Sequence, residues 1–218
     1  FYLISSFLSL IYSKNTSRSV SDHRYFILNK PYNMVSQFVS SHDVRLLKDL
    51  DFEFPVGTHA IGRLDQNSEG LLLLTTNKKI TRLLFQADEP HERTYLVQVV
   101  YAMSESDLDK LRAGLGISSK RGTEWQTKPC KAKFVPKPEN LWQAGEEIPE
   151  FVPSSWIELS LVEGKFHQVR KMVRALNYRC RRLIRTSIED LTLDNLLPGE
   201  VKEINEKEFF KRLKLKEI

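Results

Sequence analysis

The stretch AIGRLDQNSEGLLLLTTN, residues 60–77, places one carboxylate at the edge of a strongly apolar segment. Asp65 precedes a polar turn, and four consecutive leucines follow that turn. An aspartate beside a segment that must be buried needs either a structural partner or a chemical role. A glycosidase would need a second carboxylate at a set separation. The nearby Glu69, on a polar turn, gives no reason to face the same substrate, so we treat Asp65 as a lone reactive carboxylate.

A second feature is a run of positive charge late in the chain. Residues 164–185 carry eight cations and no acidic residue: Lys165, Arg170, Lys171, Arg174, Arg179, Arg181, Arg182 and Arg185. A solvated helix face normally mixes both signs of charge. One unrelieved sign favours contact with phosphates, and an exposed basic face without a ligand is the alternative. The whole chain, with 33 Lys and Arg against 28 Asp and Glu, also leans towards an anionic partner.

Arg170 differs from the other cations of this run. Within GKFHQVRKMVRALN the apolar residues recur at helical spacing and predict a helix with one apolar stripe: Phe166, Val169, Val173 and Leu176. Arg170 borders that stripe, so its guanidinium can turn inwards. An inward arginine needs a carboxylate, and Asp65 is the natural candidate. A bidentate pair would fix the orientation of the carboxylate and keep it ionised.

The elements that must position these residues are strands separated by helices. RYFILNKPYNMV predicts a strand that ends at Lys30-Pro31, because proline cannot continue a central ladder. GLLLLTT predicts a short buried strand, and Asn77 can cap a following helix. The apolar residues of that helix are Ile80, Leu83, Leu84 and Ala87. TYLVQVVY and SWIELSLV alternate apolar and polar residues, as half-buried antiparallel strands do.

Two more helices complete the expected α+β fold. Ser104 with Asp107 resembles a capping box, and the helix it opens should stop near Gly114. EKEFFKRLKLKEI predicts a short amphipathic helix on the outside of the protein. Residues 116–153 hold much of the Pro, Gly and mixed charge, so we expect this region to be rich in loops.

Composition indicates a globular protein with its own core. The 218 residues are 41% hydrophobic and 28% charged, and Cys130 and Cys180 lie far apart outside any C-x-x-C pair. This cysteine usage disfavours a zinc site and suits a reducing cytosol. The polar run SKNTSRSVSDH divides an N-terminal extension (1–23) from a main domain (24–205), which a helical tail (206–218) follows. The apolar start FYLISSFLSLIY is too short to span a bilayer, and we expect it to be a packed or frayed extension.

Four motifs together resemble a known family. ILNKP, GRLDQNSEGLLLLTTN, TYLVQV and LVEGKFHQVRKM occur in an order and spacing similar to the pseudouridine synthases of the RsuA/RluE type. The resemblance extends from about Arg24 to Ile204. The absence of a basic S4-like module before ILNKP is most similar to the RluE branch, which modifies large-subunit ribosomal RNA. The resemblance implies a largely antiparallel mixed sheet of two lobes, flanked by helices, with the active-site cleft between the lobes.

The resemblance also implies roles for individual residues. Asp65 matches the catalytic aspartate, and Tyr95 matches the tyrosine that stacks on the target uracil. Arg170 matches the basic residue that pairs with the aspartate, and Arg63 matches an arginine that helps to hold the place of the extruded nucleotide. The other residues expected to contact RNA are Lys165, His167, Lys171, Arg174, Arg182 and Arg185. The residues expected to shape the site are Lys30, Pro31, Gly62 and Gly70.

The implied function is isomerisation of a specific uridine in 23S ribosomal RNA to pseudouridine. This chemistry requires no cofactor and no metal, but it requires a carboxylate acting near ribose C1′ as nucleophile or general base. We expect ribosomal RNA or an assembly intermediate as the partner, a cytoplasmic location, no membrane association and a monomer. The alternative is a ribosome-associated RNA-binding protein that has lost activity. ADEPHERTY and EWQTKPCKAKF depart from the family pattern, in segments that concern RNA contacts and not the catalytic trio.

Overall fold

A computed structural model describes residues 23–85, 90–118, 122–144, 148–149 and 151–216. The apolar start and nearly all of the predicted linker lie outside the described residues, as does Ala87 of the predicted helix. Within the described ranges, no helix combines the length and the apolar character needed to cross a membrane.

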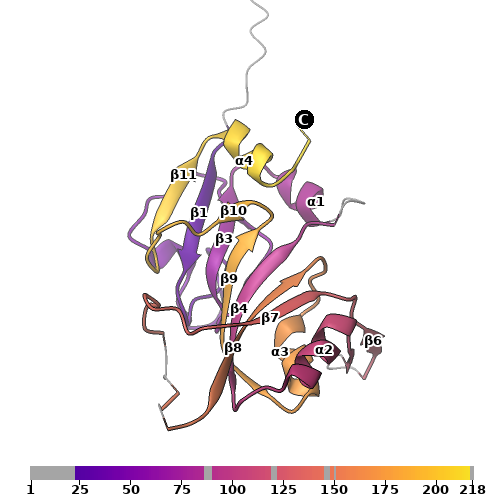
Figure 1. The fold of residues 1–218 in the computed structure, drawn as a ribbon. Coiled ribbons are helices and arrows are strands. Elements are labelled where there is room, and N and C mark those ends of the chain that lie inside the picture. Colours follow the sequence, from indigo (N-terminus) through magenta and orange to yellow (C-terminus); the bar gives the residue numbers. More distant parts are fainter. Residues whose placement is uncertain (1–22, 86–89, 119–121, 145–147, 150, 217–218) are drawn as a thin grey trace, which may run out of the picture.

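One mixed sheet forms the frame of the described protein (Figure 1). It has nine strands in the order β11-β1-β3-β9-β4-β8-β7, with β2 paired to β3 and β10 paired to β9. These strands are β1 (Tyr25–Lys30), β2 (His59–Ile61), β3 (Glu69–Thr75), β4 (Arg93–Val100), β7 (Lys131–Val135), β8 (Ser154–Leu161), β9 (Arg179–Ile188), β10 (Leu191–Thr192) and β11 (Val201–Ile204). A separate antiparallel pair consists of β5 (Gly116–Ser118) and β6 (Glu124–Gln126).

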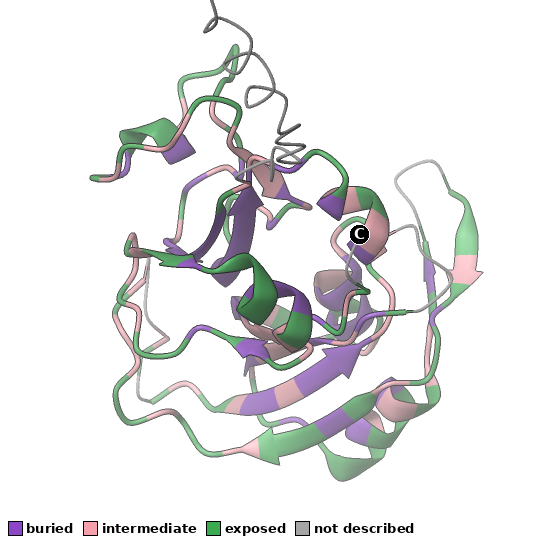
Figure 2. Cartoon of the chain, turned by 90° about the horizontal axis from the view of Figure 1, so that it is seen from above, coloured by how far each residue is buried: buried purple, intermediate pink, exposed green. Residues whose placement is uncertain are grey.

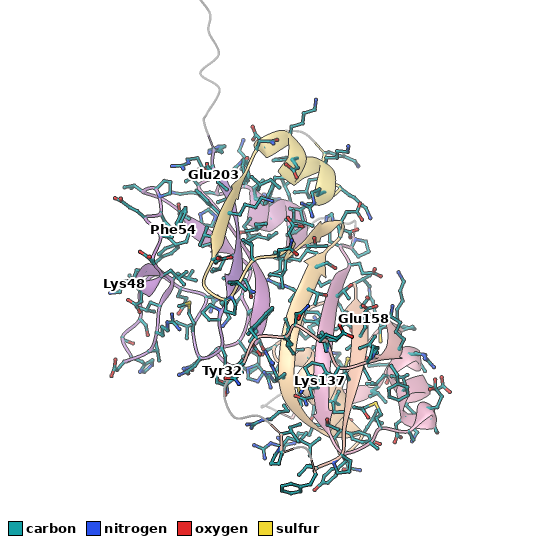
Figure 3. All side chains as sticks on the ribbon, turned by 60° about the vertical axis from the view of Figure 1, so that its left-hand side comes forward. Tyr32, Lys48, Phe54, Lys137, Glu158 and Glu203 are labelled. Atoms are coloured by element: carbon teal, nitrogen blue, oxygen red, sulfur yellow. The ribbon has the colours of Figure 1, made fainter. Side chains whose placement is uncertain are left out.

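A single parallel pairing in the described sheet, β3 with β9, joins two lobes. β11, β1 and β3 lie in the first lobe, and β4, β8 and β7 lie in the second (Figure 1). The helices are α1 (Ile80–Phe85), α2 (Glu105–Ala113), α3 (Gln168–Ala175) and α4 (Glu206–Arg212). Figure 3 shows Phe54 and Glu203 in the first lobe and Glu158 in the second. The predicted α+β fold, with a largely antiparallel mixed sheet in two lobes, is confirmed.

The leucine run of β3 is buried on both faces of the sheet. Leu71 and Leu73 belong to a core cluster that includes residues of α1 and α4, whereas Leu72 and Leu74 belong to a different cluster beside β1. Successive side chains of a strand point to opposite faces. A strand without apolar–polar alternation therefore needs cover on both sides, and here it has that cover. Figure 2 shows the buried residues concentrated on the strands.

Several predicted elements are confirmed, and the caps explain where they begin and end. β1 ends at Lys30, directly before Pro31. The Ser104 hydroxyl accepts a hydrogen bond from the Asp107 amide at 3.1 Å, and α2 ends before Gly114, whose φ is 89°. β4 and β8 pair along their whole lengths as antiparallel neighbours, as their alternation predicted.

Two expectations about the second half of the chain are confirmed, the loop-rich region at 116–153 and the short amphipathic helix at the surface. Residues 116–153 contain β5, β6 and β7 in addition to loops. The tail helix α4 lies at the surface with Glu206 and Glu208 exposed, and its apolar face is buried: the ring centroids of Phe209 and Phe210 lie 4.6 and 5.9 Å from that of Tyr25. The apolar face of α4 predicts that another element covers it. That element is β1, which begins about 180 residues earlier in the chain.

The predicted apolar stripe before and within α3 needs correction. Phe166 precedes the helix and is 61% exposed. His167 adopts the left-handed conformation with φ 55°, so the helix begins only at Gln168. The buried face of α3 consists of Gln168, Val169, Met172 and Val173.

Candidate active site

A cleft with a volume of about 520 Å³ opens where the two lobes meet. It is lined by the turn between β2 and β3, by residues of β4 and β9, and by the segment that leads into α3. Asp65 and Tyr95 both line it. Arg170 is not part of the lining but contacts Asp65 from beside it. The structure therefore brings the three predicted catalytic residues together at one cleft.

Asp65 is held by the turn that carries it. Its carbonyl accepts a hydrogen bond from the Ser68 amide at 3.0 Å, which closes the turn before β3. The preceding Leu64 is buried, and the Ser36 hydroxyl both donates to its carbonyl at 2.9 Å and accepts from its amide at 3.0 Å. The Asp65 side chain stays 27% exposed at the cleft. A fixed backbone with an accessible carboxylate suits a reactive group more than a structural one.

Lys30 supports this turn from below. Its side chain is fully buried, and the ammonium donates to the carbonyls of Pro31, Met34 and Gln66 at 2.8, 2.6 and 3.3 Å. Burial lowers the pKa of Lys30 to about 7, an effect opposed by the nearby carboxylates of Glu69 and Asp65. The Lys30-Pro31 pair thus ties the end of β1 to the turn that holds the catalytic candidate.

Gly62 and Gly70 each occupy a place where a side chain would not fit. Gly70 lies within β3 with φ 96°, and a Cβ there would overlap the carbonyl of Arg185 on β9. Gly62 has φ 71°, and a Cβ there would lie 2.6 Å from the ring of Phe85. Gly70 lies inside the leucine strand β3 and lets β9 approach closely.

Two basic residues flank the Asp65 carboxylate. His167 Nε2 lies 3.4 Å from Oδ1, and Arg170 Nε lies 3.8 Å from Oδ2. The predicted bidentate Arg170–Asp65 pair is therefore absent. The Arg170 Nη2 group instead donates to the Asn67 carbonyl at 2.7 Å and to the Ser68 hydroxyl at 3.3 Å. Arg170 thus binds the backbone of the turn more closely than it binds the acid.

Tyr95 lies on β4, in the middle of the sheet. It pairs with Leu159 of β8 on one side and with Arg185 of β9 on the other. A register shift on β9 falls next to it, between Thr94 and Tyr95. Bulges of this kind re-aim side chains and are common beside active sites. The ring is only partly buried and faces the cleft, so it can meet a base that enters the cleft.

Arg182 and Arg185 do not belong to the exposed basic surface that the sequence predicted. Arg182 is 5% exposed and pairs with Glu69 through two hydrogen bonds of 3.0 and 2.8 Å, so the expectation that it contacts RNA is wrong. Trp142 Nε1 also donates to Glu69 at 2.7 Å. Arg185 is 2% exposed and lines the cleft from within. The charge of residues 164–185 is partly neutralised by acids distant in the sequence.

The remaining predicted RNA contacts lie nearer the surface. Arg63 and Lys165 are exposed and line the cleft at its rim. The Lys171 ammonium lies 4.9 Å from the ring centroid of Trp125 and 5.6 Å from that of Phe166. Arg174 is exposed on α3 and does not line the cleft.

Comparison with known proteins decides the family. The sequence pattern described as RNA pseudouridylate synthase matches residues 24–175 of the chain. The chain belongs to this family.

Some of the similar proteins are named for the large ribosomal subunit and others for the small one. Ribosomal large subunit pseudouridine synthase E of Vibrio parahaemolyticus is 34% identical over 189 residues, covering 85% of this chain and 75% of the relative. The protein of the same name from Xanthomonas axonopodis pv. citri is 34% identical, covering 79% and 89%. Ribosomal small subunit pseudouridine synthase A of Yersinia pestis is 28% identical, covering 85% and 71%.

A solved crystal structure of a pseudouridylate synthase has the same fold. It superposes with a TM-score of 0.70 at 27% identity, covering 88% of this chain and 74% of that one. The human RNA pseudouridylate synthase domain containing 1 protein shares the fold alone, with a TM-score of 0.51 at 18% identity.

Three residues of this pseudouridylate synthase were missed as site candidates. Phe166 stacks on the His167 ring with centroids 3.8 Å apart and planes 18° apart, but its place in an apolar repeat predicted a core residue. Glu69 was set aside as part of a polar turn, although it is the first residue of the buried strand β3 and pairs there with Arg182. Arg93 stands two residues before Tyr95, a spacing that puts both side chains on one face of a strand.

Proposed function

We propose that this chain isomerises one uridine of large-subunit ribosomal RNA to pseudouridine, with Asp65 as the catalytic carboxylate. The observation that carries the proposal is the placement of Asp65, rigidly held yet 27% exposed, in the same cleft as Tyr95. Relatives at 34% identity that are named for large-subunit RNA support the substrate class.

The reaction breaks the bond between uracil N1 and ribose C1′, turns the uracil and joins C5 to C1′. C5 loses its proton and N1 gains one. The product is an isomer of the substrate, so no external oxidant or reductant enters. Asp65 acts near C1′ as nucleophile or general base. His167 and Arg170, one beside each carboxylate oxygen, hold that group in place. The Tyr95 ring stacks on the uracil, a contact worth roughly 1–3 kcal/mol per base.

The target base must leave its stack before it reaches Asp65, which costs a few kcal/mol. Residues at the rim of the cleft can offset that cost. Arg63 and Lys165 offer cations for phosphates, and these contacts weaken as salt is added. Phe166 offers an exposed ring on which a neighbouring base can stack. A stacking ring next to cations is a typical surface for single-stranded RNA.

Replacement of Asp65 by asparagine tests the assignment. Asp65→Asn keeps the shape of the side chain and removes its charge, so RNA binding should stay nearly intact while pseudouridine formation is abolished. Carbodiimide-stop mapping of ribosomal RNA incubated with each protein provides the measurement. Equal modification by both proteins would contradict the role of Asp65. Absence of modification by the wild type would favour the inactive RNA-binding alternative.

We also propose that the enzyme acts as a monomer in the cytoplasm, where ribosomal subunits are assembled. The support for a monomer is that one chain supplies Asp65, Tyr95 and their flanking residues. Light scattering of the eluted protein during size-exclusion chromatography measures its mass, and a dimer mass would contradict this part of the proposal.

A further inference from the structure

Arg93, the first residue of β4, is a buried cation at the cleft. It is 7% exposed and lines the same cleft as Asp65 and Tyr95. Its guanidinium lies over the Phe85 ring, 4.7 Å from the centroid. Within the described part of the chain, no hydrogen bond or ion pair accompanies that contact. A guanidinium that is removed from water without a direct ion pair carries a desolvation penalty.

Arg185 is a second buried cation beside Tyr95. It lies opposite Tyr95 on the neighbouring strand β9 and also lines the cleft. Its Nε donates to the Leu71 carbonyl at 2.7 Å, but its Nη2 is buried without a partner among the described residues. Buried polar groups in native proteins are rarely left unsatisfied. A donor of this kind at a binding cleft therefore indicates a ligand atom that completes it.

The carboxylates that line the described cleft do not neutralise this pair of arginines. Asp65 lies between His167 and Arg170. Glu163 accepts hydrogen bonds from the Lys128 amide at 2.9 Å and from Gln168 Nε2 at 2.5 Å. Burial lowers the pKa of Arg93 and the like charge of Arg185 acts in the same direction, whereas Tyr95 and the Glu189 carboxylate oppose them. Two neighbouring cations thus face a cleft in which the acids are already occupied.

Gly164 keeps part of Arg93 accessible from the cleft. A Cβ at this glycine would lie 3.4 Å from Arg93 Nη1, in van der Waals contact. Glycine therefore leaves open the side from which an acceptor can approach that nitrogen. Gly164 also lines the cleft, and its φ lies outside the left-handed region, so alanine is compatible with its backbone.

We propose that Arg93 and the free Nη2 group of Arg185 form an anion subsite that binds one backbone phosphate of the nucleotide entering the cleft. This subsite rests on the proposed function, because it assigns part of the same substrate. A phosphate is the ligand of choice since guanidinium groups offer forked N–H donors that match phosphate oxygens. The uracil of the substrate is neutral, and the acceptors that it offers to a guanidinium group are uncharged carbonyl oxygens. The phosphate thus anchors the nucleotide while Tyr95 stacks on its base.

Binding of small probes tests the subsite without any need for catalysis. Uridine, uridine 5′-monophosphate, uridine 3′-monophosphate and inorganic phosphate are titrated into the full chain by calorimetry or NMR. We expect at least one monophosphate to bind at least about tenfold more tightly than uridine, as a charge-assisted contact predicts. Equal affinity of uridine and both monophosphates for the wild type would overturn the subsite. If inorganic phosphate binds as tightly as both monophosphates, so that the nucleoside adds nothing to the affinity, the subsite is also overturned.

The variants decide which residues are responsible. Arg93→Met should remove most of the monophosphate advantage, and Gly164→Ala should reduce it by covering Nη1. Arg82→Met, at an exposed arginine that does not line the cleft, should leave this advantage unchanged. Phe85→Leu removes the ring beneath the guanidinium but keeps the donors, so the advantage should persist. If Phe85→Leu loses the monophosphate advantage as fully as Arg93→Met does, Arg93 has only a packing role and the proposal fails.

The same titrations with Asp65→Asn separate this subsite from the proposed function. Asp65→Asn should retain the monophosphate advantage, since the carboxylate does not touch Arg93 or Arg185. If pseudouridine formation is absent while the advantage is present, the proposed reaction fails and the subsite stands. If formation occurs and Arg93→Met changes neither probe binding nor the KM for RNA, the subsite fails and the reaction stands.

Discussion

His167 lies closer to the Asp65 carboxylate than Arg170 does, at 3.4 Å against 3.8 Å. The two residues approach different oxygens, so together they bracket the acid. Both come from one short segment, because His167 directly precedes α3 and Arg170 lies in the first turn of that helix. The left-handed conformation at His167 turns the chain so that one helix start supplies both neighbours. Such a conformation is costly for a bulky residue and often marks a functional site.

Arg170 should matter more for catalysis than for stability. Arg170→Lys keeps a charge but loses the hydrogen bond of Nη2 to the Asn67 carbonyl, so the turn that holds Asp65 loosens. We expect kcat to fall roughly 10–100-fold, the scale of a small misplacement of a catalytic group. The free energy of unfolding should fall by only ~1 kcal/mol, because the pair is partly exposed. Tritium release from the target uracil and urea unfolding measure the two effects, with Arg174→Lys as control. Full kcat in Arg170→Lys would contradict this role.

Gly70 should be far less replaceable than Gly57, although both have positive φ. An alanine at Gly57 meets no atom within 4 Å and adds only backbone strain, about 1–2 kcal/mol. An alanine at Gly70 has that strain and also overlaps the backbone of Arg185. We expect Gly70→Ala to lose roughly 1–3 kcal/mol more than Gly57→Ala in urea unfolding. Equal losses would show that β9 can move away from β3.

Stability should depend on pH through Lys30. Burial lowers its pKa to about 7 in the folded protein, against roughly 10.4 for a free lysine. Between these values the unfolded chain binds more protons at this residue than the folded chain, so the free energy of unfolding rises with pH. The limiting slope is ~1.4 kcal/mol per pH unit for one proton. Wild type should therefore gain stability relative to Lys30→Met from about pH 7 upwards and show a constant difference below it. Urea unfolding of both proteins from about pH 6 to pH 9 checks this. A difference independent of pH over the whole range would contradict it.

Phe166 should contribute to RNA binding and not to folding. Its side chain is 61% exposed, so Phe166→Ala should change the free energy of unfolding by less than ~0.5 kcal/mol. Loss of a stacked base should weaken RNA binding by roughly 1–3 kcal/mol, and Phe166→Tyr should restore it. Phe151→Ala is the matched control, since that ring is 87% exposed, whereas Phe166 stands between Lys165 and His167, which line the cleft. Fluorescence anisotropy with a labelled fragment of large-subunit RNA measures the affinity. Equal affinities of Phe166→Ala and Phe151→Ala would rule out the stacking role.

Local patterns predicted most strands and helices because their signals act over a few residues. The continuous leucines of β3, the alternation of β4 and β8, and the Ser104 cap of α2 all correspond to elements of the structure. The start of α3 was wrong because the left-handed His167 interrupts a repeat that continues in the sequence. Periodicity reports which residues would face one side of a helix, but not whether the helix reaches them.

For the candidate site, the sequence predicted the catalytic candidates but not the partners of the charged residues. Asp65, Tyr95 and Arg170 were identified by motifs whose order resembles a family, and the cleft brings them together. The partners of the charged residues were not predictable. Arg182 looked like an exposed cation, yet its partner Glu69 lies 113 residues away in the sequence. Whether an arginine meets a phosphate or a buried carboxylate depends on which strands become neighbours.

By itself, the sequence determined the alternation of elements, the family resemblance and the residue at which a carboxylate meets a buried strand. These depend on side-chain chemistry and short-range spacing, which the chain carries locally. Only the tertiary structure decided that β3 runs beside β9, that Arg182 is neutralised, and that Arg93 and Arg185 face one cleft. Pairing between distant strands arises from the packing of the whole core. Burial and electrostatic partnership are properties of that packing, and no local pattern encodes them.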